Sequence, residues 1–251
     1  MPLGTLGKDP IVLQPWGAIE GTLLVAGQPA AEQGVTLGTA AAIEPEGTLT
    51  INAQANTTTD DNGRFRFPKV PAGPLVVCRY FNFNRDKIGP VGMSHNQEII
   101  LPAGGVAEVK LGGEGRMLLG RLALSRELKG HNWRDDLQVL TEAGQTQPRI
   151  SARPNTPEWR RGLRELNRFW ARQHKYYLEI EPDGAFRIAD VPPGEYVLQL
   201  TVAEPFDPDA YDPAGNPIMR RTLGSLTRPV SVSASAAGEP LDLGSITVPL
   251  D

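Results

Sequence analysis

The chain has 251 residues, of which 40% are hydrophobic and 22% charged, and a formal net charge of −4 at pH 7. This length suits one or two domains, and the apolar content is enough for two modest cores. An acidic balance provides no global basic field, which argues against nucleic acid as a partner. A single cysteine excludes an internal disulfide framework and a cysteine-rich metal site.

The sequence contains no run of 18 apolar residues and therefore predicts no membrane span. Its first ten residues lack the basic and apolar regions of a secretory signal peptide. Two interpretations remain open: a cytoplasmic protein, or a piece of a longer secreted chain.

In the first half of the chain, short apolar or alternating segments lie between Gly- and Pro-rich turns, which is typical of a β protein. We expect strands over residues 18–25, 35–37, 48–59, 64–67, 75–78, 97–101 and 106–111. The glycine-rich segment 112–115 predicts a domain boundary.

One segment occurs twice. Residues 61–73 and 182–194 match at a constant separation of 121 positions, for example at Gly63 and Gly184. In each copy a turn dipeptide precedes a strand of alternating apolar and polar residues, and Val-Pro-x-Gly ends that strand. The repeat predicts two domains of one architecture, each built on an antiparallel meander.

The second copy of the unit contains an insertion. Gly21 and Gly63 are 42 positions apart, whereas the corresponding Gly120 and Gly184 are 64 apart. The extra residues fit one helix near 156–174, with Thr156 as the cap and proline at the first helical position. We expect its apolar stripe to be buried against the second sandwich; the stripe comprises Trp159, Leu163, Leu166 and Trp170.

The repeated segment resembles the motif of the carboxypeptidase regulatory-like family, which is also described as transthyretin-like or carbohydrate-binding-like. Residues 59–73 match it closely, and residues 181–194 match it with Ile188 in place of the second Phe. The resemblance implies an all-β fold of two tandem antiparallel, Ig-like or transthyretin-like β-sandwiches, over 1–113 and 114–251, with the α-helix inserted in the second.

Further phrases, over residues 13–17 and 242–246, resemble segments of large bacterial cell-envelope proteins built from such modules. This resemblance implies a fragment that lacks its signal peptide and belongs to the periplasm or the cell surface. It also implies that the partners are neighbouring domains of the same longer chain or another envelope protein.

No motif in the chain indicates catalysis, a cofactor or a metal ion. The three histidines, His95, His131 and His174, are isolated, and we expect ordinary surface or loop residues. Cys78 lies in an apolar strand and is expected to be buried and inert. Acidic residues beside the turns fit turn chemistry better than a calcium loop; they are Asp60, Asp61 and Asp183.

Two groups of side chains are candidates for an interaction surface. Four arginines form a basic stripe on the inserted helix, either a solvated face or a docking face for an acidic neighbour: Arg161, Arg164, Arg168 and Arg172. Phe81 and Phe83 follow a strand and could stack on a sugar or a partner, whereas Tyr80 is expected in the core.

We therefore expect a non-catalytic module pair, not an enzyme, that serves as a spacer or a protein-interaction platform in a larger bacterial envelope protein. One alternative is a carbohydrate-binding module with a glycan as its ligand, which rests on analogy of fold. The other is part of an unrecognised hydrolase.

Overall fold

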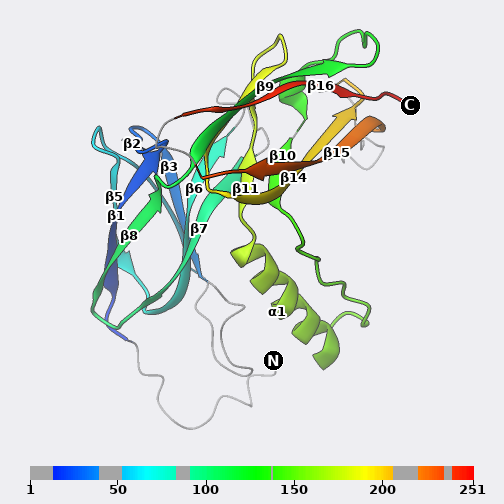
Figure 1. Ribbon diagram of the computed structural model, residues 1–251. Coiled ribbons are helices and arrows are strands. Elements are labelled where there is room, and N and C mark those ends of the chain that lie inside the picture. Colours follow the sequence, from blue (N-terminus) through cyan, green and yellow to red (C-terminus); the bar gives the residue numbers. More distant parts are fainter. Residues whose placement is uncertain (1–13, 40–52, 83–90, 137, 206–219, 235–238) are drawn as a thin grey trace.

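The structure is a computed structural model, and it describes residues 14–39, 53–82, 91–136, 138–205, 220–234 and 239–251. These residues form two β-sandwiches and one α-helix, α1 (Pro157–Arg172), which lies below the second sandwich (Figure 1). The expected all-β fold with one inserted helix is confirmed.

The first sandwich consists of two four-stranded sheets. One sheet contains β2 (Gln28–Pro29), β1 (Gly17–Val25), β5 (Arg64–Val70) and β8 (Val106–Gly112). The other has the order β4 (Gln54–Thr58), β3 (Gly34–Thr39), β6 (Gly73–Asn82) and β7 (Val91–Leu101).

The second sandwich repeats this arrangement. One sheet has the order β12 (Glu179–Ile180), β13 (Ala185–Val191), β9 (Arg116–Leu124) and β16 (Leu241–Val248). The other has the order β11 (Lys175–Tyr177), β10 (Val139–Glu142), β14 (Gly194–Ala203) and β15 (Thr222–Val232). A short 3-10 helix, Trp133–Asp135, precedes β10.

Most strand pairs are antiparallel, as expected, and each sandwich also contains one parallel pair. The first strand β1 pairs in parallel with the last strand β8, from Ala18–Val106 to Leu24–Gly112. In the second sandwich β9 and β16 form the same parallel pair. The shared topology shows that the sequence repeat is also a structural repeat.

The repeated segment forms the predicted turn and strand in both copies. Gly63 and Gly184 have φ of 70° and 82°, a conformation that glycine adopts without a Cβ clash. Asp60 Oδ1 accepts hydrogen bonds from the backbone N–H groups of Asn62 and Arg64, and Asp183 Oδ1 accepts one from Ala185. These contacts are turn chemistry.

In each sandwich a phenylalanine ring packs directly against a glycine of the first strand. A Cβ at Gly21 would lie 2.4 Å from Cζ of Phe65, and one at Gly120 would lie 2.6 Å from Cζ of Phe186. Both rings come from the repeated segment and are buried. The ring therefore occupies the space that any larger residue at the glycine would need.

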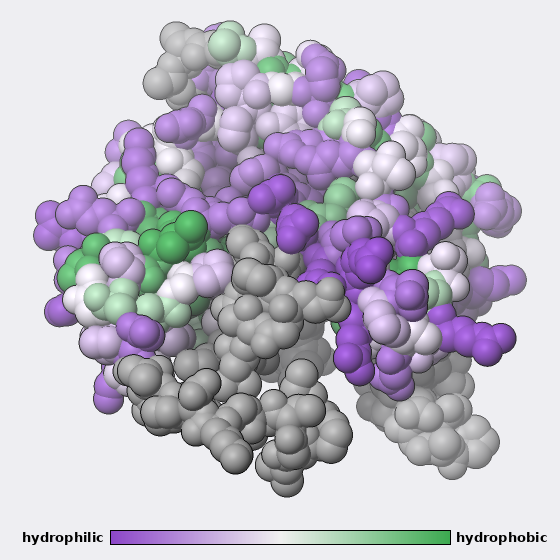
Figure 2. All heavy atoms as spheres, turned by 90° about the horizontal axis from the view of Figure 1, so that it is seen from below, coloured by the Kyte–Doolittle hydropathy of each residue, from purple (hydrophilic) through white to green (hydrophobic). Residues whose placement is uncertain are grey.

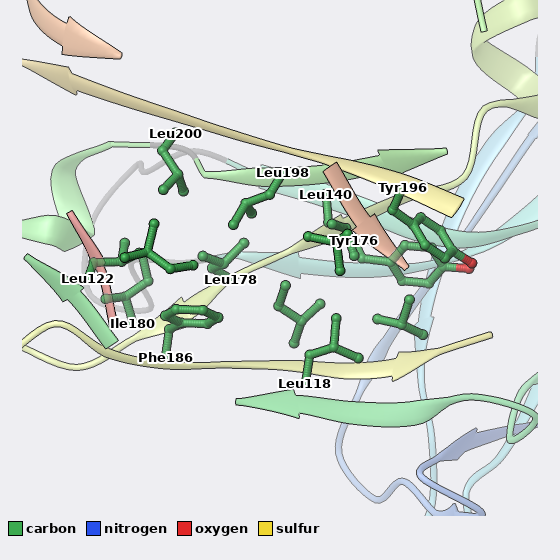
Figure 3. Close-up of a cluster of buried hydrophobic side chains, with 14 of the residues drawn as sticks. Leu118, Leu122, Leu140, Tyr176, Leu178, Ile180, Phe186, Tyr196, Leu198 and Leu200 are labelled. Atoms are coloured by element: carbon green, nitrogen blue, oxygen red, sulfur yellow. The ribbon is translucent and has the colours of Figure 1, made fainter. Parts of the chain in front are cut away.

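The cores are separate clusters between the two sheets of each sandwich. In the second, Leu118 and Phe186 from one sheet face Leu140 and Leu198 from the other (Figure 3). Each such large apolar side chain contributes about 1.5–3 kcal/mol when fully buried.

Helix α1 begins and ends as predicted, but its apolar stripe is not buried. The Thr156 hydroxyl caps the helix by accepting from the Trp159 N–H, and Gln173 follows its last turn. No residue of α1 is buried, and Trp170 is 45% exposed. The prediction that this stripe is buried against the second sandwich is therefore wrong, because side chains of the two sheets already fill the core of that sandwich.

Tyr80 is half-buried rather than part of the core. The core-facing residues of β6 are Leu75 and Val77, which alternate with the position of Tyr80, so the expectation that Tyr80 lies in the core is wrong.

Candidate functional site

The most constrained place in the structure is the junction between the sandwiches. Only residues 113–115 separate β8 from β9. Gly112 and Gly113 have φ of 68° and 89°, in the left-handed region that favours glycine. A Cβ at Gly112 would lie 2.3 Å from Oδ2 of Asp190 and 2.4 Å from the Leu24 carbonyl oxygen. The connection is therefore short and closely surrounded.

Asp190, at the end of β13, holds this connection from the second sandwich. Its carboxylate accepts hydrogen bonds from the Gly113 N–H at 2.6 Å and from the Gly115 N–H at 3.0 Å. The residue is only 1% exposed and has φ of 59°. The corresponding residue of the first copy is Lys69, which is exposed. The junction thus depends on a residue in which the two copies differ.

His95, from β7 of the first sandwich, completes the contact. Its Nε2 lies 3.1 Å from Oδ2 of Asp190 and 3.2 Å from the Asp190 carbonyl oxygen. Nδ1 is 2.9 Å from Oγ of Ser94, which orients the ring. The expectation of an ordinary surface or loop histidine is wrong for His95, which is 8% exposed.

A β-bulge in β7 directs two of its side chains toward the second sandwich and α1. Along β6 and β7, Val77 pairs with Gln97 and Arg79 with Ser94, so two residues of β7 oppose one residue of β6. An extra residue in one strand turns side chains away from the regular alternation. One bulged residue is His95, with φ of 57°, and the other is Asn96.

Asn96 connects the bulge to helix α1. Its Nδ2 donates to the backbone carbonyls of Ala171, at 3.3 Å, and Gln173, at 3.4 Å, at the C-terminal end of the helix. Nearby, Arg172 Nε lies 3.3 Å from Oε1 of Glu98 on β7. The inserted helix is therefore attached to the first sandwich, although it belongs to the second in sequence.

The charges at the junction support an ionised Asp190. Burial alone would raise the pKa of this carboxyl group. His95 lowers the pKa through its hydrogen bond and its charge, and the backbone N–H groups of Gly113 and Gly115 lower it through their hydrogen bonds. The pKa of Asp190 therefore lies below its usual value. A carboxylate that accepts several hydrogen bonds is stabilised in its charged form.

Two tyrosines extend this polar network into the second core. The Tyr176 ring meets the His95 ring edge to face, with centroids 5.4 Å apart. The rings of Tyr176 and Tyr196 also meet edge to face, with centroids 5.9 Å apart, and the Tyr196 hydroxyl donates to the Pro192 carbonyl at 2.9 Å. Figure 3 shows the two hydroxyls together at one end of the core. Burial raises the pKa of Tyr196 to about 12, so it stays neutral.

Arg79 forms a further link between the sandwiches. It is 8% exposed, and its Nη2 donates to Oε1 of Gln33 at 2.9 Å and lies 3.9 Å from Oε1 of Glu179. Burial lowers the pKa of this guanidinium, and the charges of Glu179 and Asp190 act in the opposite direction. Charged groups of both sandwiches therefore face each other here.

The residues predicted from the sequence lie mainly elsewhere. Of the four arginines, Arg172 contacts Glu98 of β7 near the junction; Arg161 and Arg168 are exposed and Arg164 is half-buried on α1. Phe81 pairs with Gly92 in the backbone of β6 and β7, and Phe83 lies outside the described residues.

A second buried ion pair lies in the second sandwich. Asp136 Oδ1 is 3.1 Å from Nη1 of Arg220, and its Oδ2 accepts from the Ala203 N–H. Burial raises the pKa of Asp136 and Arg220 opposes this shift. Within the described ranges, no group of three or more His, Cys, Asp or Glu residues could hold a metal ion. The helix found there is also shorter and more polar than crossing a bilayer requires.

No family model and no curated protein matches the chain. Among solved structures, it is similar to the minor pilin of Streptococcus agalactiae, with a TM-score of 0.32 and 14% identity over 94% of this chain and 96% of that one. A DUF3823 family protein of Bacteroides uniformis gives 0.30 and 13% identity, over 88% and 100% of the two chains. A Pseudomonas aeruginosa protein proposed to bind carbohydrate gives 0.27 and 18% identity, over 42% and 98%.

Proposed function

We propose that this chain is a non-catalytic pair of carboxypeptidase regulatory-like β-sandwich modules that acts as a rigid spacer and interaction platform in a larger bacterial envelope protein. The observation that carries the proposal is the buried contact of His95 and Asp190 across the short glycine connection. A flexible tether would need neither a buried charge nor glycines enclosed by neighbouring groups.

The contact supports rigidity because it limits movement in more than one direction. Asp190 binds the connection itself, His95 binds Asp190 from β7, and Asn96 holds the end of α1. Swinging one sandwich away would separate all three contacts and leave a carboxylate without its partners, which is costly for a buried group.

The experiment measures the distance between the sandwiches directly. Spin labels on Thr57 of β4 and Ser225 of β15 should give one narrow distance distribution in the parent chain by pulsed electron resonance. Asp190→Lys, which imitates the first copy of the repeat, should broaden that distribution. Asp61→Lys is a matched control at an exposed turn and should leave it narrow. A parent distribution as broad as that of Asp190→Lys would refute the spacer.

The envelope setting has its own test. The resemblance of the repeated segment supports a module of a longer exported chain, and cell fractionation of the full-length gene product would locate it. Recovery of that product in the cytoplasm alone would contradict the envelope part of the proposal. A turnover activity abolished by one substitution would contradict its non-catalytic part.

A further inference from the structure

Positive charge in this chain is concentrated in one segment. Residues 143–175 contain two acidic residues, Glu158 and Glu165, against eight basic residues: Arg149, Arg153, Arg160, Arg161, Arg164, Arg168, Arg172 and Lys175. The segment therefore has a net charge of +6 in a chain of −4, which leaves −10 elsewhere. Seen from below, hydrophilic side chains crowd the side of the molecule where α1 lies (Figure 2).

The same segment forms an open groove. After β10 the chain returns along α1, close enough that a Cβ on Gly162 would lie 3.3 Å from Cγ1 of Ile150. Between this return segment and the C-terminal half of the helix is a groove of about 360 Å³, lined by Gln145, Thr146, Glu165, Arg168, Phe169 and Arg172. Its volume is enough for a few side chains of a partner.

The residues that line the groove indicate the chemistry of the partner it would bind. Arg168 and Arg172 are both exposed. Arg172 pairs with Glu98, and ion pairs of exposed side chains contribute little to stability, so either arginine can exchange its present contact for a carboxylate of a partner. Phe169 offers an apolar surface between them. Gln145 and Thr146 supply amide and hydroxyl groups that can pair with a peptide backbone.

Glu165 favours a peptide over a ligand that carries negative charge at every position. Its carboxylate lies among the groove residues and repels a ligand that carries negative charge at every position. A nucleic acid, an anionic polysaccharide or an anionic lipid surface is such a ligand. A peptide can instead place a backbone N–H beside Glu165 and carboxylates beside the arginines.

We propose that this groove binds an extended acidic peptide segment of a neighbouring protein, with an apolar side chain on Phe169 and carboxylates facing Arg168 and Arg172. The proposal rests on the interaction-platform part of the proposed function. It is independent of the spacer part, because the Asp190 variants that test the spacer do not alter the groove.

The probe is a fluorescein-labelled peptide of ten residues that alternates glutamate and leucine, measured by fluorescence polarisation with the full chain. Arg168→Glu should weaken its binding by about tenfold, which is the loss expected when one attractive pair becomes repulsive. Arg161→Glu is the matched control: the same charge change at an exposed arginine of the same helix, outside the groove. It should change the affinity by less than about twofold.

Two comparisons test the nature of the ligand. A peptide with glycine in place of every leucine should bind several-fold more weakly, and so should the Phe169→Ala chain. Circular dichroism of the Phe169→Ala chain and of the parent is compared to check that the helix is intact, and Arg168→Gln provides a milder second variant. A heparin fragment should compete poorly.

Three outcomes would overturn the proposal. The first is no binding of the glutamate–leucine peptide at low salt. The second is an equal loss for Arg161→Glu and Arg168→Glu, which would indicate diffuse charge attraction. The third is equal binding of heparin or of the glycine peptide, which would assign the surface to polyanions. In each case a narrow interdomain distance distribution would leave the spacer proposal intact.

Discussion

Removing the Asp190 carboxylate should destabilise the contact between the sandwiches more than any other single change at the junction. Asp190→Ala takes the acceptor away from two backbone N–H groups, those of Gly113 and Gly115, and removes the carboxylate that Nε2 of His95 contacts. Alanine also tolerates the φ of 59° at this position less well than aspartate does.

The magnitude follows from these losses. Each N–H left without an acceptor costs about 1–3 kcal/mol, and the low end applies because both bonds are only part-buried. Loss of the contact to His95 adds a similar amount, and removing one partner of a buried pair typically costs about 3–5 kcal/mol. We expect a decrease of about 3–5 kcal/mol in the free energy of unfolding.

Urea unfolding of the whole chain, followed by circular dichroism and tryptophan fluorescence, measures this decrease. Asp190→Gly separates the two causes, because it removes the carboxylate but relaxes the backbone, and it should be less harmful than alanine by about 1 kcal/mol. Asp190→Asn keeps one acceptor oxygen and should fall between alanine and the parent. If the free energy of unfolding of Asp190→Ala lies within about 1 kcal/mol of that of the parent, the junction does not hold the sandwiches together as described.

Other expectations concern pH, the helix and the thiol. Because the pKa of Asp190 is lowered on folding, its contribution to stability is fully present above its ordinary value of 3.8 and is lost as pH falls below that value, so acid titration of unfolding should be shallower in Asp190→Asn. Trp170→Ala should cost at most about 1 kcal/mol, whereas Trp133→Ala, at a residue 6% exposed, should cost about 3–5 kcal/mol in thermal or urea unfolding. Burial raises the pKa of Cys78 to about 12, so a thiol reagent should label it only on unfolding; rapid labelling of the folded chain would refute this.

Local rules in the sequence predicted the hairpins and the helix because they act over a few residues. An Asn-Gly or Asp-Gly turn followed by alternating residues specifies a hairpin by itself, as at Gly63 and Gly184. Thr156 followed by a proline specifies where a helix begins in the same way. The parallel pairing of β1 with β8 was not predicted, since no local pattern encodes which distant strand lies alongside.

Periodicity also left the environment of the helix undetermined. Apolar residues at helical spacing show that α1 has an apolar face, but not that anything covers it, and Trp170 is exposed. The junction was missed for a related reason: His95 and Asp190 are far apart in sequence, and a bulge brings one to the other. One signal was present, namely that the copies carry Lys69 and Asp190 at equivalent positions.

The parallel pairs of first and last strands have a mechanical consequence. In each sandwich the chain enters at one end of β1 or β9 and leaves from the opposite end of its neighbour β8 or β16. Tension along the chain therefore slides the two strands past each other, so that it loads the hydrogen bonds from Ala18–Val106 to Leu24–Gly112 together. An antiparallel hairpin pulled at its open end would lose its bonds one at a time. A force applied along the chain therefore loads the parallel strand pair of each sandwich in shear.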